Sequence, residues 1–189
     1  LVYSIGAYTH RSIHVISADG SGDELLLDGS GRRPVDSPSW SPDGSTIAFV
    51  RGDNDCGERC TAVTRNELEA WVMDVDGSDL RPVAPGFHVS GTPAWSPDGS
   101  SIAVVAIGAD RRSHVFLLSL SEGGALQLTH HVSRAPVWSP DGERIAFLAR
   151  DKSPWRIYIN QSDGSSAGEV VTPAIWKGST LLWDDAPVT

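Results

Sequence analysis

Short runs of apolar residues recur along the chain, and within each run the apolar residues are continuous and do not alternate with polar ones. The runs cover residues 47–50, 102–105 and 145–148. A strand with one face in water alternates apolar and polar residues, whereas a strand covered on both faces does not. The pattern therefore predicts short strands that lie between two neighbouring sheets, and the small alanine in each run would let an adjacent sheet approach closely.

A seven-residue motif precedes each of these runs. Ser-Pro-Asp-Gly within it is a turn sequence, because Pro fixes φ at the first central position, Asp suits the second, and Gly takes the left-handed conformation that follows. We expect a tight hairpin between a Trp-containing strand and the apolar strand. The three copies are Pro38-Ser39-Trp40-Ser41-Pro42-Asp43-Gly44, Pro93-Ala94-Trp95-Ser96-Pro97-Asp98-Gly99 and Pro136-Val137-Trp138-Ser139-Pro140-Asp141-Gly142.

Two further strand-like stretches follow each hairpin and complete a four-stranded unit. The third strands are expected at 71–73, 115–118 and 157–159, and the fourth at 80–83, 126–129 and 169–172. Repeats of about 40–45 residues with four strands each are typical of propeller blades. The tryptophans recur at one position of the repeat, which favours a packing role over carbohydrate stacking.

The predicted fold is all-β, a β-propeller of about four four-stranded antiparallel blades in one domain. A partial blade spans 1–37, full blades span about 38–92, 93–135 and 136–172, and a degenerate closing segment spans 173–189. The first blade lacks its Trp strand. Trp176 would supply it by pairing with the N-terminal blade, but Leu181-Leu182-Trp183 would then duplicate Leu1-Val2-Tyr3 and leave one extra strand. An insertion at 52–67 separates the second and third strands of its blade.

The Pro-x-Trp-Ser-Pro-Asp-Gly repeat resembles that of the TolB-type, WD40-like β-propeller family, and the resemblance covers nearly the whole chain. Members of that family usually have six or more blades, and the best-known ones lie in the bacterial periplasm or on the cell surface. They serve as protein-binding platforms or as non-catalytic propellers of larger peptidases. The resemblance thus implies a periplasmic or extracellular location. It leaves three architectures open: a fragment or open part of a larger propeller, an unusual small propeller, or a ring completed by a second chain in a homodimer.

Charge limits the partners. The formal net charge is -9 and the pI is about 5.0. Such a surface repels phosphate backbones, so nucleic acid and anionic membranes are poor partners. No apolar run approaches the ~18 residues that span a bilayer, and no signal sequence is present. The chain opens in the strand-like Leu1-Val2-Tyr3, as expected of a mature or excised domain.

The segments that enter the first strand of each blade hold the candidate binding residues. In a propeller these segments line one mouth of the central channel, and polar groups that converge there would bind a small ligand or another protein. The alternative is a wet pore without a ligand. The candidates are Arg33, Asp36, His88, His131 and Arg134, with Ser90 and His130 beside them.

Two motifs raise the question of metal ions. Asp74, Asp76 and Asp79 resemble the start of a calcium loop, but the downstream glutamate is missing, and we favour a plain Asp-Gly hairpin turn. Cys56 and Cys60 allow a small-loop disulfide or free thiols, because no further ligands complete a zinc site. No cofactor other than calcium is indicated.

No catalytic signature accompanies the repeats. The sequence lacks Gly-x-Ser-x-Gly, His-Glu-x-x-His and a phosphate loop. We therefore predict a non-catalytic module that binds a protein or a ligand. The alternative is the propeller portion of a larger enzyme, either a peptidase of the prolyl oligopeptidase type or a polysaccharide lyase.

Overall fold

The computed structural model describes residues 1–6, 11–29, 34–52, 68–121, 123–150, 154–165 and 168–171. These residues form antiparallel strands arranged in four sheets, and no helix occurs among them. The described chain accordingly has no helix with the length and apolar character needed to cross a membrane. The all-β prediction is confirmed. The chain divides into two compact units, Leu1–Pro93 and Ala94–Thr189, and each is described by itself.

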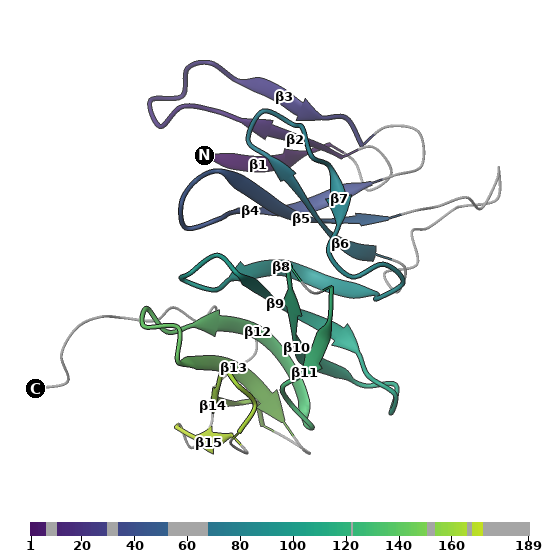
Figure 1. The fold of residues 1–189 in the computed structure, drawn as a ribbon, viewed down its shortest axis with the longest axis vertical. Helices are drawn as coiled ribbons and strands as arrows, with labels where there is room; N and C mark the ends of the chain where they lie inside the picture. The colour runs from purple at the N-terminus through teal and green to yellow at the C-terminus, as the bar shows by residue number, and fades with distance from the viewer. Residues whose placement is uncertain are drawn as a thin grey trace, which may run out of the picture. The chain divides into compact units, whose positions relative to one another are not determined.

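The first unit holds a three-stranded sheet and a four-stranded sheet, each in sequential strand order (Figure 1). The three-stranded sheet corresponds to the partial blade that the sequence predicts at the N-terminal end. The strands of the first sheet are β1 (Val2–Ile5), β2 (Ser12–Val15) and β3 (Glu24–Leu27). Those of the second are β4 (Val35–Trp40), β5 (Thr46–Gly52), β6 (Leu68–Asp74) and β7 (Arg81–Pro82).

The second unit carries the remaining two blades, each a four-stranded sheet in sequential order. One sheet consists of β8 (Val89–Trp95), β9 (Ser101–Ile107), β10 (Ser113–Ser119) and β11 (Ala125–Gln127). The other consists of β12 (Val132–Trp138), β13 (Arg144–Arg150), β14 (Arg156–Gln161) and β15 (Glu169–Val170). Four strands per repeat and the hairpin order are therefore as the sequence predicts.

The Ser-Pro-Asp-Gly segments form the expected hairpin turns. In the first copy the Gly44 amide donates to the Ser41 carbonyl at 3.0 Å, and Gly44 has a φ of 72°. The serine has a second role, since the buried Ser41 Oγ accepts the Thr46 amide at 2.9 Å and donates to Asp43 Oδ1 at 2.6 Å. The same bonds recur in the other two copies, so the serine closes the hairpin from inside.

The first strand of each repeat begins before the proline of the motif, and β4 and β12 contain an irregularity there. The β4–β5 register shifts between Asp36 and Ser39, and the β12–β13 register shifts between Arg134 and Val137. Proline has no amide hydrogen to donate to the ladder, and a bulge places it where no ladder hydrogen bond is needed. Ser37 and Ala135, which precede the prolines, accordingly take positive φ values of 54° and 51°. These first strands thus begin inside the segments that the sequence assigned to the preceding blades.

Each unit has an apolar core formed between its two sheets. In the first unit Ile13 of β2 packs with Ile47 and Phe49 of β5 and Met73 of β6. In the second unit the equivalent cluster joins residues of both sheets; it comprises Ala103, Val115, Leu128, Ile145, Phe147 and Ala149. The continuous apolar runs are buried on both faces of their strands, as predicted. Trp40 and Trp138 pack against these clusters.

Side chains also fasten neighbouring blades through backbone carbonyls. Trp138 Nε1 donates to the Ala94 carbonyl at 3.0 Å, and Asn160 Nδ2 donates to the Leu128 carbonyl at 2.9 Å. Each donor lies on a different blade from its acceptor.

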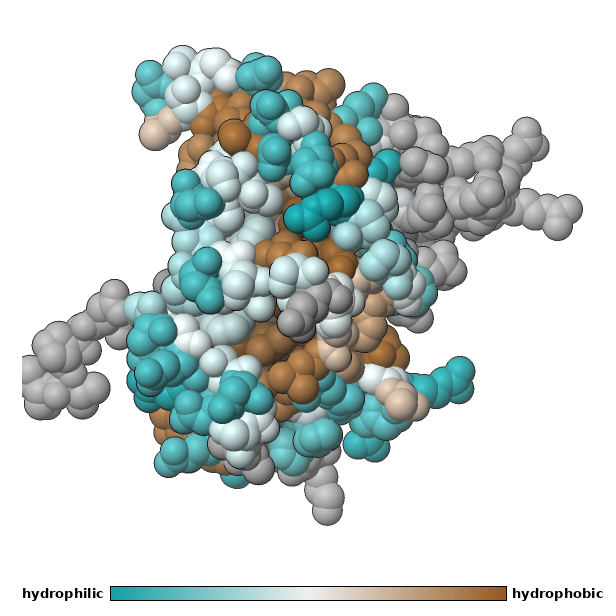
Figure 2. Space-filling model, in the orientation of Figure 1, coloured by the Kyte–Doolittle hydropathy of each residue, from teal (hydrophilic) through white to brown (hydrophobic). Residues whose placement is uncertain are grey.

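The β1–β3 sheet leaves several apolar side chains in water. Leu1, Ile5 and Leu25 are 73%, 55% and 53% exposed. Figure 2 shows apolar atoms reaching the surface in this region, which is uppermost in the view. Exposed apolar side chains of this kind are expected on a blade whose faces are covered by neighbouring blades.

Some of the predicted features lie outside the described residues. They are Arg33, the cysteines Cys56 and Cys60, most of the insertion at 52–67, and the closing segment 173–189 with Trp176. The disulfide and the ring closure stay predictions.

Candidate functional site

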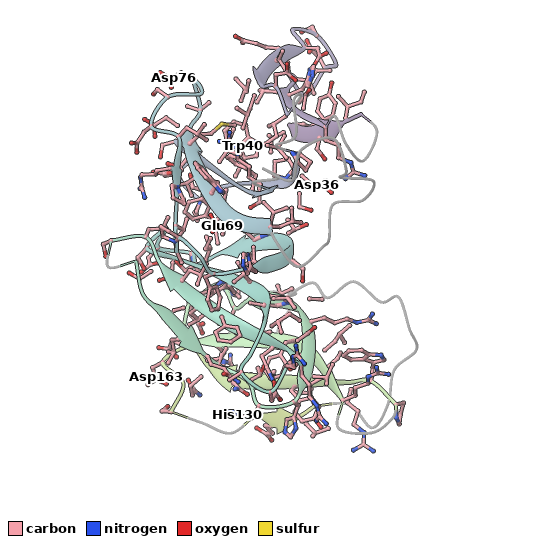
Figure 3. The ribbon with its side chains drawn as sticks, turned by 90° about the vertical axis from the view of Figure 1, so that its right-hand side faces the viewer. Asp36, Trp40, Glu69, Asp76, His130 and Asp163 are labelled. Carbon is pink, nitrogen blue, oxygen red and sulfur yellow. The ribbon has the colours of Figure 1, made fainter. Side chains whose placement is uncertain are left out.

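The candidate residues gather at one end of each blade, which we call the strand-start end because the first strand of the blade begins there. In the β4–β7 sheet Asp36 pairs with Val50, and on its other side Val50 pairs with Ala70, which follows Glu69 in β6. Asp36 and Glu69 therefore lie at the same end of the sheet. Asp74 pairs with Thr46 at the opposite end. Figure 3 shows Asp36 and Glu69 well separated from Asp76.

Asp36 is held by groups from two other segments of the first unit. Its carboxylate forms an ion pair with Arg11 and accepts a hydrogen bond from Ser4 Oγ at 2.8 Å. The Ser37 amide donates to the same carboxylate at 2.8 Å, which stabilises the positive φ of Ser37. Asp36 therefore joins the partial blade to the next one, a structural role that the sequence did not reveal.

His88 lies on the surface just before β8. Its backbone forms an isolated antiparallel bridge with Glu69, and the Glu69 carboxylate accepts the Gly86 amide at 2.6 Å. The segment that leads into β8 is thereby anchored to β6, and the imidazole of His88 is exposed. Ser90 follows within the strand.

His131 in the second unit is positioned by a histidine that the sequence analysis missed. His114, 1% exposed, directs Nδ1 at the His131 carbonyl at 2.9 Å and Nε2 at Asp110 Oδ1 at 2.8 Å. The carbonyl and the carboxylate are both hydrogen-bond acceptors, so the two ring nitrogens of His114 are held between them. The bond from His114 lowers the pKa of the Asp110 carboxyl. The His131 ring itself lies 5.7 Å from the ring of Tyr158.

Arg134 stacks on an aromatic ring at the same end of the second unit. Its Cζ lies 4.2 Å from the ring centroid of Trp155, and that of Arg150 lies 4.8 Å from it. Trp155 immediately precedes β14 and is 9% exposed. Arg150 pairs with Val132 across the β12–β13 ladder, which brings both arginines to the strand-start end. Cations over a tryptophan face attract the ring's negative potential.

The proposed calcium loop has the geometry of a hairpin turn. Asp76 Oδ1 accepts the amide and the hydroxyl of Ser78, at 2.9 and 2.6 Å, and these bonds lower the pKa of Asp76. Asp79 pairs with Arg81 at 3.1 Å. Nowhere in the described part of the chain do three His, Cys, Asp or Glu side chains form a group that could hold a metal ion.

The structure thus brings some predicted residues together within each unit. Asp36 and the segment of His88 share the strand-start end of the first unit, while His131 and Arg134 share that of the second. Asp110, His114, Arg150 and Trp155 join the second set without a signal in the repeat, because none of them belongs to the recurring motif. Convergence of both sets on one channel mouth stays a prediction.

Sequential four-stranded antiparallel sheets, hairpins closed by Ser-Pro-Asp-Gly, and cores formed between successive sheets define a β-propeller. The family model of the TolB beta propeller domain matches residues 3–178. The chain belongs to this family.

Relatives of two kinds share its repeats. The Tol-Pal system protein TolB of Rhizorhabdus wittichii is 33% identical over 86 residues, which are 46% of this chain and 17% of that protein. An uncharacterized peptidase, YuxL of Bacillus subtilis, is 31% identical over 77 residues, which are 39% of this chain and 10% of the relative. The matched region is thus a small part of either relative.

Solved structures agree on the fold. A Mycobacterium tuberculosis puromycin-hydrolyzing peptidase superposes with a TM-score of 0.65 and 20% identity, over 87% of this chain and 26% of that one. At this identity the likeness concerns the fold alone.

Proposed function

We propose that the chain is a non-catalytic binding module that engages a protein partner through its strand-start ends. The observation that carries the proposal is the gathering of His131, Arg134, Arg150 and Trp155 at one end of the second unit. Aromatic and arginine side chains are enriched where proteins bind one another. The name of the Rhizorhabdus relative places it in a multi-component system, which supports a protein as the partner.

The same kinship supports a proposal for the location of the chain. We place the chain outside the cytoplasm, in the periplasm or on the cell surface, by its membership of the TolB propeller family. The disulfide between Cys56 and Cys60 is part of this proposal, because disulfides persist in oxidising compartments. Thiol labelling of the unreduced, denatured chain tests it: no labelling is expected, and labelling of both cysteines would contradict it.

A second candidate function is the propeller portion of a larger peptidase. The peptidase relative from Bacillus subtilis favours it. The reading frame around the coding sequence distinguishes the two functions. A hydrolase domain with a Gly-x-Ser-x-Gly nucleophile motif in the same frame would establish the peptidase.

Site-specific photo-crosslinking in the cells of origin tests the binding function. A photoreactive residue replaces His130, which is exposed and lies just before β12 at the strand-start end, or Asp163, which is exposed in the turn after β14 at the opposite end of the same sheet. We expect one discrete crosslinked protein from position 130 and none from position 163. Equal products from both positions, or none from 130, would refute the assignment. Alanine at His88 and His131 together should abolish the product and leave the fold intact.

A homodimer that completes a ring is a further part of the proposal. The exposed apolar side chains of the β1–β3 sheet support it, since a second copy would cover them. Light scattering after size exclusion measures the mass directly. Twice the 20.2 kDa of one chain is expected of the dimer, and the mass of a single chain would dismiss it.

A further inference from the structure

Arg134 presents a pair of hydrogen-bond donors that nothing in the described chain accepts. Its Nε and Nη2 atoms are both buried and lack a hydrogen-bond partner within that part of the chain. Nε and Nη2 are the two nitrogens on one edge of the guanidinium plane, and their N–H bonds point in parallel. An acceptor for both must itself have two oxygens at matching spacing, as a carboxylate or a phosphate does.

The unpaired edge is fixed in place by its surroundings. The flat face of the Arg134 guanidinium lies over Trp155, so the ring holds the plane while the buried edge has no acceptor within the described chain. Arg134 is also paired with the fully buried Leu148 and precedes the bulge at Ala135. A buried charged donor without an acceptor is costly, and a protein keeps one where an acceptor arrives from elsewhere.

The positive charge around Arg134 favours a negatively charged ligand. Arg150 adds a second guanidinium over the same ring, whereas the whole chain has a net charge of -9. Three other arginines of the described chain have carboxylate partners: Arg11 pairs with Asp36, Arg81 with Asp79 and Arg144 with Asp141. No carboxylate pairs with Arg134 or Arg150 among the described residues. The two arginines are therefore a positive spot on an acidic protein.

Apolar side chains pack around Trp155. Val132, Leu148 and Ile157 belong to the same cluster as Trp155, so the anion would sit beside apolar surface. We propose that Arg134, with Arg150 and Trp155, binds an acidic side chain of the protein partner, its carboxylate bridging Nε and Nη2 of Arg134. The inference rests on the proposed binding function and names the chemistry of that site.

The test follows the Nε–Hε signal of Arg134 by NMR in the ¹⁵N-labelled chain. The probes are N-acetyl-glutamate amide, its neutral isostere N-acetyl-glutamine amide, and inorganic phosphate at the same ionic strength. We expect a saturable downfield shift of this signal with the glutamate probe and none with the glutamine probe. The signal is assigned by its loss in Arg134→Lys and, independently of that variant's folding, by connection to the backbone resonances.

Arg134→Lys keeps the charge and removes the two-pronged edge. We expect it to weaken binding of the glutamate probe about tenfold, whereas Arg144→Lys, an arginine at the opposite end of the same sheet, should leave binding unchanged. No shift at saturating probe, an equal shift with the glutamine probe, or a response to phosphate alone would overturn the inference. Partner capture at position 130 without any glutamate response would refute the carboxylate and leave the binding function standing.

Discussion

Replacing Ser96 by alanine isolates the contribution of the serine in the Ser-Pro-Asp-Gly turn. Ser96 is 3% exposed, its Oγ accepts the Ser101 amide at 3.0 Å, and it donates to Asp98 Oδ1 at 2.6 Å. Alanine fits the space but leaves the Ser101 amide without its side-chain acceptor. A buried donor that loses its partner costs about 1–3 kcal/mol. The lost bond to Asp98 adds little, because that carboxylate is exposed.

We therefore expect Ser96→Ala to lower the free energy of unfolding by about 2 kcal/mol. For a chain of this size that corresponds to a fall in melting temperature of about 4–8 °C. Urea denaturation followed by tryptophan fluorescence measures the first quantity, and calorimetry measures the second.

Ser100→Ala is the matched control. Ser100 lies in the same turn and its Oγ also binds Asp98, at 2.9 Å, but the residue is exposed and its hydroxyl accepts no backbone amide. We expect its effect to stay within about 0.5 kcal/mol. If Ser96→Ala proves no more destabilising than Ser100→Ala, the hairpins are not closed by the serine, and the reasoning fails.

Three further predictions concern acid, packing and calcium. Hydrogen bonds from Ser41 and Ser45 lower the pKa of Asp43 from 3.8 to about 2, so its contribution to stability is present above pH 3.8 and is lost as the pH falls toward 2; Asp43→Asn should flatten that part of the stability–pH curve, and an unchanged acid limb contradicts this. A Cβ on Gly108 would lie 2.7 Å from the His114 ring, so Gly108→Ala should cost about 1–3 kcal/mol, whereas Gly124→Ala, with no atom within 4 Å, should not destabilise the fold; equal effects in denaturation would contradict the clash. Millimolar calcium should leave the melting temperature unchanged, and a rise that Asp76→Asn removes would establish the ion site.

The repeat made most of the fold predictable. Three copies of one motif fixed the strand order and the hairpins, and continuous apolar runs indicated strands covered on both faces. The start of the first strands was not predictable from the motif, because the chain passes its proline through a bulge. A residue such as Ala135 at positive φ carries no sign of this in its side chain.

The candidate site was predictable only in outline. Arg134 and His131 were found because they precede a recurrent strand, which is a matter of position in the repeat. Trp155 and His114 were missed because they act through contacts across strands, and no spacing in the sequence encodes those contacts. Asp36 was assigned to binding, but its ion pair with Arg11 depends on the partial blade folding beside β4.

The bonds that fasten one blade to the next have a consequence for how such chains change over evolutionary time. The indole of Trp138 and the amide of Asn160 are directed at main-chain oxygens, which every amino acid supplies. The side chains of the neighbouring blade can therefore change while its backbone carbonyl still accepts the hydrogen bond. Single blades can therefore be duplicated, deleted or changed in sequence without a compensating substitution in the neighbouring blade. The surface residues of the blades can vary while the fold is kept.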